Sequence, residues 1–450
     1  MQTLAQLALG LRSLVFTSTG LTEAALAAAQ DSRGQGAQTF IHIDARAARA
    51  QAQAADLLRQ SGAELSPIMG IPISVKDLFD ISGQTTRAGS RVLDNAPPAT
   101  ADATIVARLR QAGAVIIGRT NMVEFAYSGL GLNPHYGTPL NPWDRIQGRI
   151  PGGSSSGAAV SVTDGMCAAA IGTDTGGSVR IPAALCGLTG FKPTACRIDR
   201  GGTLPLSNSL DSIGPLAPSV ACCAMLDAIL AGIKPVEPTA SDTARLRLLV
   251  PSNVILDELE DPVARAFEAA LARLSASGAH IVHARLPEID EWRQTLAPRD
   301  SLAAAEAYAW HRHLLNEDEA AYDPRVARRL RKGAAVSAAD YIEMTALRRA
   351  WIKRLRGRFS GFDAMLMPTV SILAPPLAPL VADDSLYART NVQVLRNTSL
   401  INFFDGCALS IPCHAPGTGP VGLMVAGPSH ADAQILSVGM ALEAVLRELR

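Results

Sequence analysis

Helical and β-strand patterns alternate along the first half of the chain, and short connections join them. A short β-branched run over 71–75 predicts a strand, and a helical pattern over residues 101–111 precedes a second β-branched run over 114–117. The same order recurs when a helix over 155–162 precedes an apolar strand over 168–172, after which another helix begins near Val179. This alternation predicts an α/β fold in which helices cover both faces of a central sheet.

The pattern changes beyond about residue 240. Further strands are predicted over 245–250, 280–282, 364–367, 408–411 and 421–425, and further helices over 262–276 and 432–449. Residues 300–358 are predicted to be almost wholly helical, whereas residues 375–387 are predicted to form a loop. We interpret residues 1–450 as one domain, with a catalytic core over about 65–215 and a helical insertion over about 290–360 that forms a variable pocket wall.

The composition is that of a globular protein without a strongly charged surface. Of 450 residues, 48% are hydrophobic, and 41 basic residues balance 41 acidic ones, so we expect binding neither to nucleic acid nor to a membrane. Basic runs over 325–332 and 348–358 are predicted to be solvated helix faces. The seven cysteines form no Cys-x-x-Cys pair, and the N-terminus lacks the basic region of a signal peptide. We therefore expect a cytoplasmic protein.

Two glycine-rich loops carry the serines that most strongly suggest chemistry. They are Pro151-Gly-Gly-Ser-Ser-Ser-Gly157 and Gly172-Thr-Asp-Thr-Gly-Gly-Ser-Val-Arg180. Gly-Gly-Ser turns keep side chains away from the backbone, so N–H groups can converge on the negative charge that develops in acyl transfer. Ser178 follows a strand and opens a helix, where it is either a nucleophile or a helix N-cap. Asp174 and Arg180 flank it, and we interpret them as an ion pair that holds the loop.

Lys76 is the only basic residue of the apolar segment Gly70-Ile-Pro-Ile-Ser-Val-Lys-Asp-Leu-Phe79. One interpretation is an exposed lysine whose aliphatic stem covers apolar surface. The other is a buried lysine, because desolvation lowers the pKa of an ammonium group and can produce a neutral base. The segment by itself leaves both interpretations open.

Other chemistries have less support in the sequence. Gly157 is followed by Ala158, which excludes the Gly-Lys-Ser/Thr ending of a phosphate-binding P-loop. No Gly-x-Ser-x-Gly elbow matches the Ser178 loop, which disfavours a Ser-His-Asp triad. The eight histidines form no complete ligand set with zinc spacing, so we expect neither a metal nor a cofactor. His135 lies in a motif near the loops and is interpreted as a pocket residue.

Lys76 and the two loops, taken together, strongly resemble the amidase signature family over nearly the whole chain. Other segments that look like landmarks of that family are Thr120–Ala126, Asn133–Gly137, Asn141–Trp143, Gly190–Pro193, Asp211–Pro215 and Gly422–Val425. The resemblance implies a large, mixed, twisted central sheet and a Ser–cis-Ser–Lys triad. It makes Ser178 the nucleophile, Ser154 the bridging serine after a cis peptide bond, and Lys76 the base. Ser155 and Ser156 are then helix-start residues.

The resemblance also directs expectations for the rest of the site. The oxyanion hole is expected from the backbone N–H groups of Thr175, Gly176, Gly177 and Ser178. A candidate acyl pocket follows the Thr120 motif, although several of its members also suit core packing: Met122, Phe125, Tyr127, Leu130 and Leu132. Their apolar character favours a small neutral alkyl or aryl amide.

Three functions remain open on the sequence. The leading hypothesis is a stand-alone amidohydrolase that needs only its small-molecule amide and water, and for which a homodimer is a possible assembly. The alternative is the glutaminase subunit of a tRNA-dependent amidotransferase, which has the same triad but works inside a complex. A non-enzymatic binding relative is the third hypothesis, and the intact Lys76, Ser154 and Ser178 speak against it.

Overall fold

A single mixed β-sheet runs through the computed structural model, which describes all residues except 237–238, 298–301 and 448–450. Within the described residues the sheet has eleven strands in the order β1-β3-β2-β4-β6-β5-β10-β11-β9-β7-β8. Their bounds are β1 Phe40–Ile43, β2 Pro72–Lys76, β3 Val115–Thr120, β4 Ala169–Asp174, β5 Thr189–Lys192, β6 Ser212–Ala217, β7 Arg247–Pro251, β8 His280–Ala284, β9 Ala364–Pro368, β10 Cys407–Pro412 and β11 Gly422–Gly427.

Parallel pairs form both flanks of this sheet, except that the edge strand β1 pairs antiparallel with β3, and antiparallel pairs form its middle. β2 pairs in parallel with β3 and β4, and β7 pairs in parallel with β8 and β9. The strands between these groups pair antiparallel. The parallel strands that follow one another in the chain, β2 and β3, and β7 and β8, are each joined through a helix, because parallel strands need a long crossover connection. The predicted α/β fold with a large mixed sheet is confirmed, although β1, β5 and β6 were not among the predicted strands.

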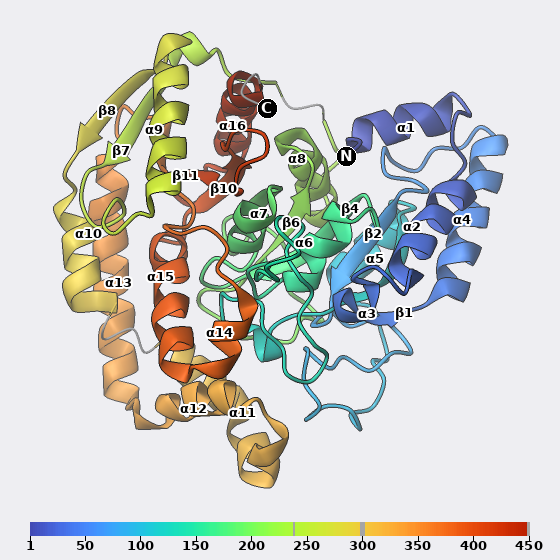
Figure 1. Cartoon of the computed structure of the whole chain (residues 1–450), viewed down its shortest axis with the longest axis horizontal. Coiled ribbons are helices and arrows are strands. Elements are labelled where there is room, and N and C mark those ends of the chain that lie inside the picture. The colour runs from blue at the N-terminus through green and yellow to red at the C-terminus, as the bar shows by residue number, and fades with distance from the viewer. Residues whose placement is uncertain (237–238, 298–301, 448–450) are drawn as a thin grey trace.

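Helices pack on both faces of the sheet (Figure 1). Those described are α1 Leu4–Arg12, α2 Ser18–Gln30, α3 Gly36–Thr39, α4 Ala45–Gln60, α5 Thr104–Gln111, α6 Ser156–Thr163, α7 Arg180–Cys186, α8 Val220–Leu230, α9 Asp261–Ala276, α10 Pro287–Glu291, α11 Leu302–Asp318, α12 Pro324–Lys332, α13 Ala338–Arg358, α14 Leu377–Ala382, α15 Asp384–Phe403 and α16 Asp432–Arg447. On β10, Leu409 lies against Gly439 of α16, whereas the next residue, Ser410, lies beside Gly422 and α7. Successive strand side chains point to opposite faces, so α7 and α16 cover opposite faces.

The predicted helical insertion corresponds to α11, α12 and α13, with α11 and α12 at the lower edge of Figure 1. Residues 298–301 of that prediction lie outside the described residues. The predicted loop over 375–387 is wrong, because α14 and the start of α15 occupy it. Its prolines fit the helix because Pro376 is the N-cap of α14 and Pro379 lies in the first turn, where N–H groups have no intrahelical partner.

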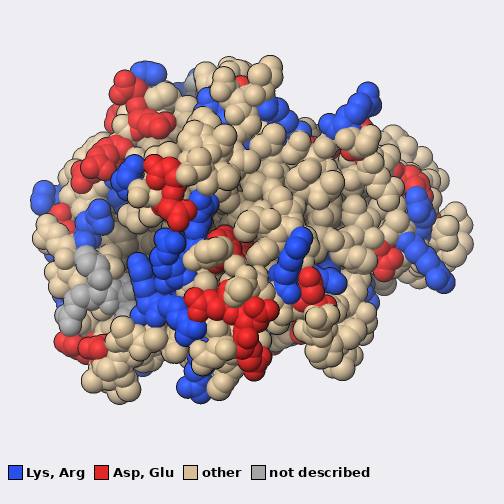
Figure 2. Space-filling view, turned by 60° about the horizontal axis from the view of Figure 1, so that its bottom comes forward, with Lys and Arg blue, Asp and Glu red and all other residues tan. Residues whose placement is uncertain are grey.

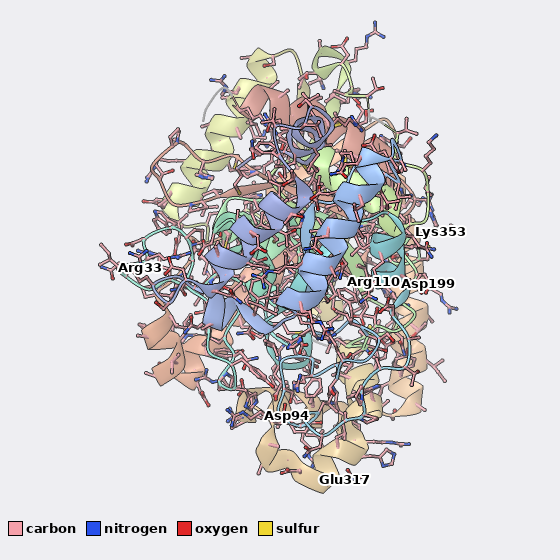
Figure 3. All side chains as sticks on the ribbon, turned by 90° about the vertical axis from the view of Figure 1, so that its right-hand side faces the viewer. Arg33, Asp94, Arg110, Asp199, Glu317 and Lys353 are labelled. Carbon is pink, nitrogen blue, oxygen red and sulfur yellow. The ribbon has the colours of Figure 1, made fainter. Side chains whose placement is uncertain are left out.

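Charged side chains are spread over the outside of the molecule. In Figure 3, Arg33, Glu317 and Lys353 lie at the margins of the view. Figure 2 shows basic and acidic side chains interspersed over one face, with a local group of Lys and Arg. Among the described helices, none combines the length and the apolar composition that crossing a membrane requires.

The ends of two parallel strands place the first residues of the site. Val75 of β2 pairs with Ile171 of β4, so the carboxyl ends of both strands lie at the same edge of the sheet. Lys76 is the last residue of β2 and Asp174 the last of β4. The glycine loop that follows β4 then leads directly into α7, which brings Ser178 to the same edge.

Candidate active site

Lys76 is fully buried, which decides between the two interpretations of the sequence. Its Nζ lies 2.7 Å from Ser154 Oγ and 2.8 Å from Thr173 Oγ1. Burial lowers the pKa of Lys76 from 10.5 to about 7, although the carboxylates of Asp174 and Asp211 act in the opposite direction. Near neutral pH a large fraction of the protein molecules therefore carries Lys76 as a neutral amine, whose lone pair can accept a proton.

Ser154 contacts Lys76 and belongs to the loop that is hydrogen-bonded to the Ser178 loop. The Gly153–Ser154 peptide bond is cis, as the family resemblance implied. Ser155 N donates to Ser178 O at 3.3 Å, so the two glycine loops are hydrogen-bonded to each other. Gly153 has no room for a side chain, because a Cβ there would lie 2.6 Å from Gly131 N. α6 begins at Ser156, in agreement with the prediction that the later serines start a helix.

The Asp174–Arg180 ion pair holds the Ser178 loop and is itself fully buried. Asp174 accepts hydrogen bonds from Gly177 N at 2.8 Å, Val179 N at 3.1 Å and Arg180 Nη2 at 2.9 Å. Burial alone would raise the pKa of Asp174, but the Arg180 guanidinium outweighs it and holds that pKa below its usual range. Asn402 of α15 donates to the same carboxylate, so the loop is supported from a helix more than 200 residues away in the chain.

One of the four predicted oxyanion donors is already engaged. Gly177 N donates to Asp174 Oδ1 and is not available to a substrate. Within the part of the chain that the structure describes, no hydrogen bond uses the N–H groups of Thr175, Gly176 or Ser178. Gly177 also has a φ of +133° and lies against Thr398, whose Oγ1 would be 2.2 Å from a Cβ, so only glycine fits. The candidate oxyanion donors are thus three rather than four.

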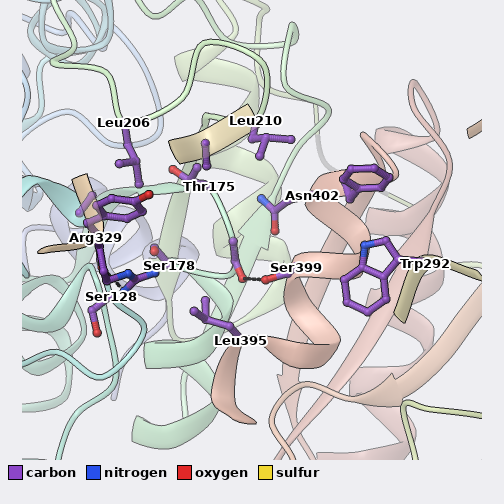
Figure 4. A pocket seen from close by; sticks show the side chains of 15 residues that line it. Ser128, Thr175, Ser178, Leu206, Leu210, Trp292, Arg329, Leu395, Ser399 and Asn402 are labelled. Carbon is purple, nitrogen blue, oxygen red and sulfur yellow. Dashed lines mark hydrogen bonds between the residues drawn. The ribbon is translucent and has the colours of Figure 1, made fainter. Parts of the chain in front are cut away.

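Ser178 opens into a cavity of about 150 Å³, shown in Figure 4. Thr175, Gly176 and Ser178 form one wall, which places the candidate donors beside the Ser178 side chain. Other lining residues are apolar (Ala126, Tyr127, Leu206, Leu210, Trp292, Ala303, Leu395 and Phe403) or polar (Ser128, Arg329, Ser399 and Asn402). None of the eight histidines, all of which the structure describes, lines this cavity. His135 instead contacts Glu124 through Nε2 at 2.8 Å.

The predicted acyl pocket is corrected by the position of its residues. Only Tyr127 lines the cavity. The other four are buried in hydrophobic core clusters, namely Met122, Phe125, Leu130 and Leu132. The backbone turns in a short 3-10 segment over Glu124–Ala126, and Phe125 then packs against His311 with ring centroids 4.3 Å apart. Because of this turn, Phe125 packs in the core whereas Tyr127 faces the cavity. The apolar character of the two residues in the sequence does not distinguish these positions.

Most of the cavity wall comes from segments to which the sequence assigned no residue roles. α15 contributes Leu395, Ser399, Asn402 and Phe403, and the loop before β6 contributes Leu206 and Leu210. Arg329 of α12 was predicted on a solvated basic face but lines the cavity. No sequence signal separates it from the other arginines of its run, because only the packing of α12 selects the arginine that faces inward.

An aromatic ring and a backbone carbonyl hold Arg329 in place. Its guanidinium stacks on the Tyr127 ring, with Cζ 4.4 Å from the centroid, and its Nη1 donates to the Tyr127 carbonyl oxygen. Among the described residues it forms no ion pair, whereas Arg325, one turn earlier, pairs with Asp384 at 2.7 Å. Within the described residues, Arg329 therefore brings to the cavity that contains Ser178 a guanidinium that pairs with no carboxylate.

Comparison with known proteins extends over almost the whole chain. The family model named Amidase matches residues 21–436. The 2-amino-5-chloromuconic acid deaminase of Comamonas testosteroni is 38% identical, over 90% of this chain and 87% of that protein. The A subunit of the glutamyl-tRNA(Gln) amidotransferase of Chloroflexus aggregans is 34% identical, over 95% of this chain and 93% of that protein.

Solved structures show the same similarity. The crystal structure of an amidase superposes with a TM-score of 0.88 at 33% identity, covering 99% of this chain and all (100%) of that one. The native peptide amidase of Stenotrophomonas maltophilia superposes with a TM-score of 0.81 at 27% identity, covering 100% of this chain and 98% of that one.

Proposed function

This chain belongs to the amidase signature family and hydrolyses carboxylic amide C–N bonds, and we propose that it does so through an acyl-enzyme on Ser178. One observation supports this assignment above all. The buried Lys76 amine lies 2.7 Å from Ser154 Oγ, and the Ser154 loop is bonded to the loop whose Ser178 opens into the cavity. Together they supply a base, a proton carrier and a nucleophile at one site.

The proposed acylation moves one proton through two hydroxyl groups. Ser178 Oγ attacks the amide carbon, its proton passes to Ser154 Oγ, and the Ser154 proton passes to the Lys76 amine. The resulting oxyanion lies against the N–H groups of Thr175, Gly176 and Ser178. The C–N bond then breaks, and the Lys76 ammonium returns a proton through Ser154 to the leaving nitrogen. Water attacks the acyl-enzyme by the same relay and releases the carboxylic acid.

A serine-directed fluorophosphonate tests the nucleophile without knowledge of the substrate. We expect one adduct per chain, located by peptide mass spectrometry on the peptide that contains Ser178, because the phosphonyl group reacts with an activated hydroxyl. Ser156→Ala is the matched control, since Ser156 lies in the other loop and its Oγ has no hydrogen-bond partner in the described structure. An adduct on Ser154 with an unmodified Ser178 would contradict the assignment.

The residues that line the cavity also indicate which class of amide the site accepts. The sequence prediction of a neutral acyl group rested on apolar residues, most of which lie in the core instead. The cavity that contains Ser178 has a largely apolar lining, with some polar side chains and the guanidinium of Arg329, which forms no ion pair with a described residue. We propose an amide with a compact apolar body that also carries a carboxylate, because a guanidinium binds a carboxylate in a paired, planar arrangement.

Two relatives are consistent with an acidic substrate. One is a deaminase whose name contains 2-amino-5-chloromuconic acid, and the other belongs to an amidotransferase named for glutamyl-tRNA(Gln). The second supports the alternative function, a glutaminase subunit inside a complex. Ammonia release from glutamine by the purified chain, with and without partner subunits, separates the alternatives. Activity on simple carboxylate-bearing amides without partners supports the stand-alone enzyme.

Arg329 provides a direct test of the substrate class. With the monoamide of a short dicarboxylic acid, we expect Arg329→Met to lower kcat/KM by roughly 10- to 100-fold, the effect of losing hydrogen bonds to a charged group. With a neutral analogue carrying a methyl group in place of the carboxylate, kcat/KM should stay nearly unchanged. Arg325→Met is the matched control on the same helix, because Arg325 is already paired with Asp384. An equal loss on both substrates contradicts carboxylate recognition.

The relay predicts a pH dependence whose direction follows from Lys76. The amine accepts a proton only when neutral, so kcat/KM should rise with pH through a limb near the Lys76 pKa of about 7. Asp211 raises that pKa by stabilising the ammonium, so Asp211→Asn should move the limb to lower pH. The measurement is kcat/KM from pH 5 to 9 for both proteins. A limb that stays in place or moves upward contradicts the role of Lys76.

A further inference from the structure

Thr173 makes a contact with Lys76 that the Ser–Ser–Lys relay does not use. Thr173 Oγ1 lies 2.8 Å from Lys76 Nζ, beside the 2.7 Å contact to Ser154 Oγ. The pairing of Val75 with Ile171 places the end of β2 beside Thr173 of β4. Asp174, the next residue of β4, bonds to Arg180, as expected when successive side chains point to opposite faces. Thr173 is 4% exposed, so water does not readily replace its hydroxyl.

A neutral amine has two N–H donors and one lone pair. During acylation the lone pair must point at Ser154, because Ser154 delivers the proton. The other close contact, to Thr173, must then be an N–H donated to the Thr173 oxygen. Without that acceptor, an N–H of Lys76 can turn toward Ser154 and the lone pair can turn away.

We propose that Thr173 is a positioning residue for the relay, whose hydroxyl oxygen accepts an N–H of Lys76 and so aims the amine lone pair at Ser154 Oγ. This inference rests on the proposed function of Ser178, Ser154 and Lys76. In the step that Thr173 prepares, the Ser154 O–H bond breaks and a Lys76 N–H bond forms. The electron pair left on Ser154 Oγ takes the proton of Ser178 as that oxygen attacks.

The charged groups around Lys76 allow the role to be tested by pH. Asp174 and Asp211 act on the ammonium, and the adjacent Asp77 is paired with Arg119 at 2.6 Å. A hydroxyl acceptor stabilises an ammonium more than a neutral amine, because hydrogen bonds to charged donors are stronger. Losing the Thr173 oxygen from a dry site should therefore lower the pKa of Lys76. Loosened packing that admits water should instead raise it, because hydration favours the charged form.

The test compares Thr173→Val, which keeps the shape, with Thr173→Ser, which keeps the oxygen. The readout is the rate constant for inactivation by a fluorophosphonate between pH 5 and 10, with wild type and Lys76→Ala alongside. We expect Thr173→Val to react roughly 10-fold more slowly on the plateau, about the effect of one buried hydrogen bond, with its acid limb moved to lower pH. Thr173→Ser should react within a few-fold of wild type. If Thr173→Val does not fold, Thr173→Ala replaces it.

Each outcome separates the two proposals. A wild-type protein that forms no adduct, or a Lys76→Ala protein that reacts as fast as wild type, contradicts the proposed function itself. A normal Lys76 dependence with a Thr173→Val plateau equal to that of wild type contradicts only the positioning role. If the acid limb of Thr173→Val moves to higher pH, Thr173 acts by keeping water out of the site. If the plateau rate constant of Thr173→Ser is as low as that of Thr173→Val, the hydroxyl oxygen does not contribute. Both of these results also overturn the positioning role.

Discussion

Ser178→Ala is expected to lower kcat by at least about 10⁴-fold, because removal of a catalytic serine leaves only binding and oxyanion stabilisation. The fold should not change, since no described residue forms a hydrogen bond with Ser178 Oγ and the loop is held by Asp174 instead. The measurements are ammonia release from a responsive amide, fluorophosphonate labelling, and the midpoint of thermal unfolding.

Ser156→Ala provides the matched control for that experiment. It removes a buried serine hydroxyl from the neighbouring loop, and it should retain both activity and labelling. If Ser178→Ala still turned over at a rate within 10-fold of wild type, a different nucleophile would have to be sought. Loss of activity accompanied by a large fall in the unfolding midpoint would instead indicate that the serine supports the loop.

Lys76→Arg is expected to be as inactive as Lys76→Ala, with kcat lowered by roughly 10²- to 10⁴-fold, the usual contribution of general-base catalysis. The Lys76 pKa is lowered to about 7 by burial, which makes a neutral amine available. Arginine carries the same charge but stays protonated over this pH range. The pair of variants thus distinguishes a base from a positive charge that merely stabilises an anion.

Activity of these variants should be followed from pH 6 to 10, with circular dichroism as the check on folding. Lys192 is the comparison residue, because it is also a buried lysine whose Nζ donates to the carbonyl oxygens of Pro193 and Gly406. Lys192→Met should affect stability rather than the pH profile, since neither described hydrogen bond of its Nζ reaches a hydroxyl of the proposed relay. A Lys76→Arg enzyme that keeps substantial activity at neutral pH would contradict the assignment of Lys76 as the base.

Local patterns in the chain predicted most of the scaffold. The alternation of 3.6-residue and 2-residue periodicity located β2, β3 and β4, along with α5, α6 and α9. Three strands were missed: the short edge strand β1, and β5 and β6 in the middle of the sheet. β5 and β6 contain Gly190, Gly214 and Pro215, which weaken a strand signal. The helical start of α15 was missed because prolines precede it, and Asp383 caps it through its side chain.

The sequence by itself determined the α/β fold class, the two glycine-serine loops and the family. The family resemblance in turn implied the roles of Lys76, Ser154 and Ser178 in the relay. These follow from short segments, because periodicity, glycine turns and motif spacing are local properties. Tertiary structure alone decided that Lys76 is buried, that Gly177 N is already bonded, and that Arg329 rather than Phe125 reaches the cavity. Desolvation, donor occupancy and pocket composition depend on neighbours that are distant in the chain, and only packing brings those neighbours together.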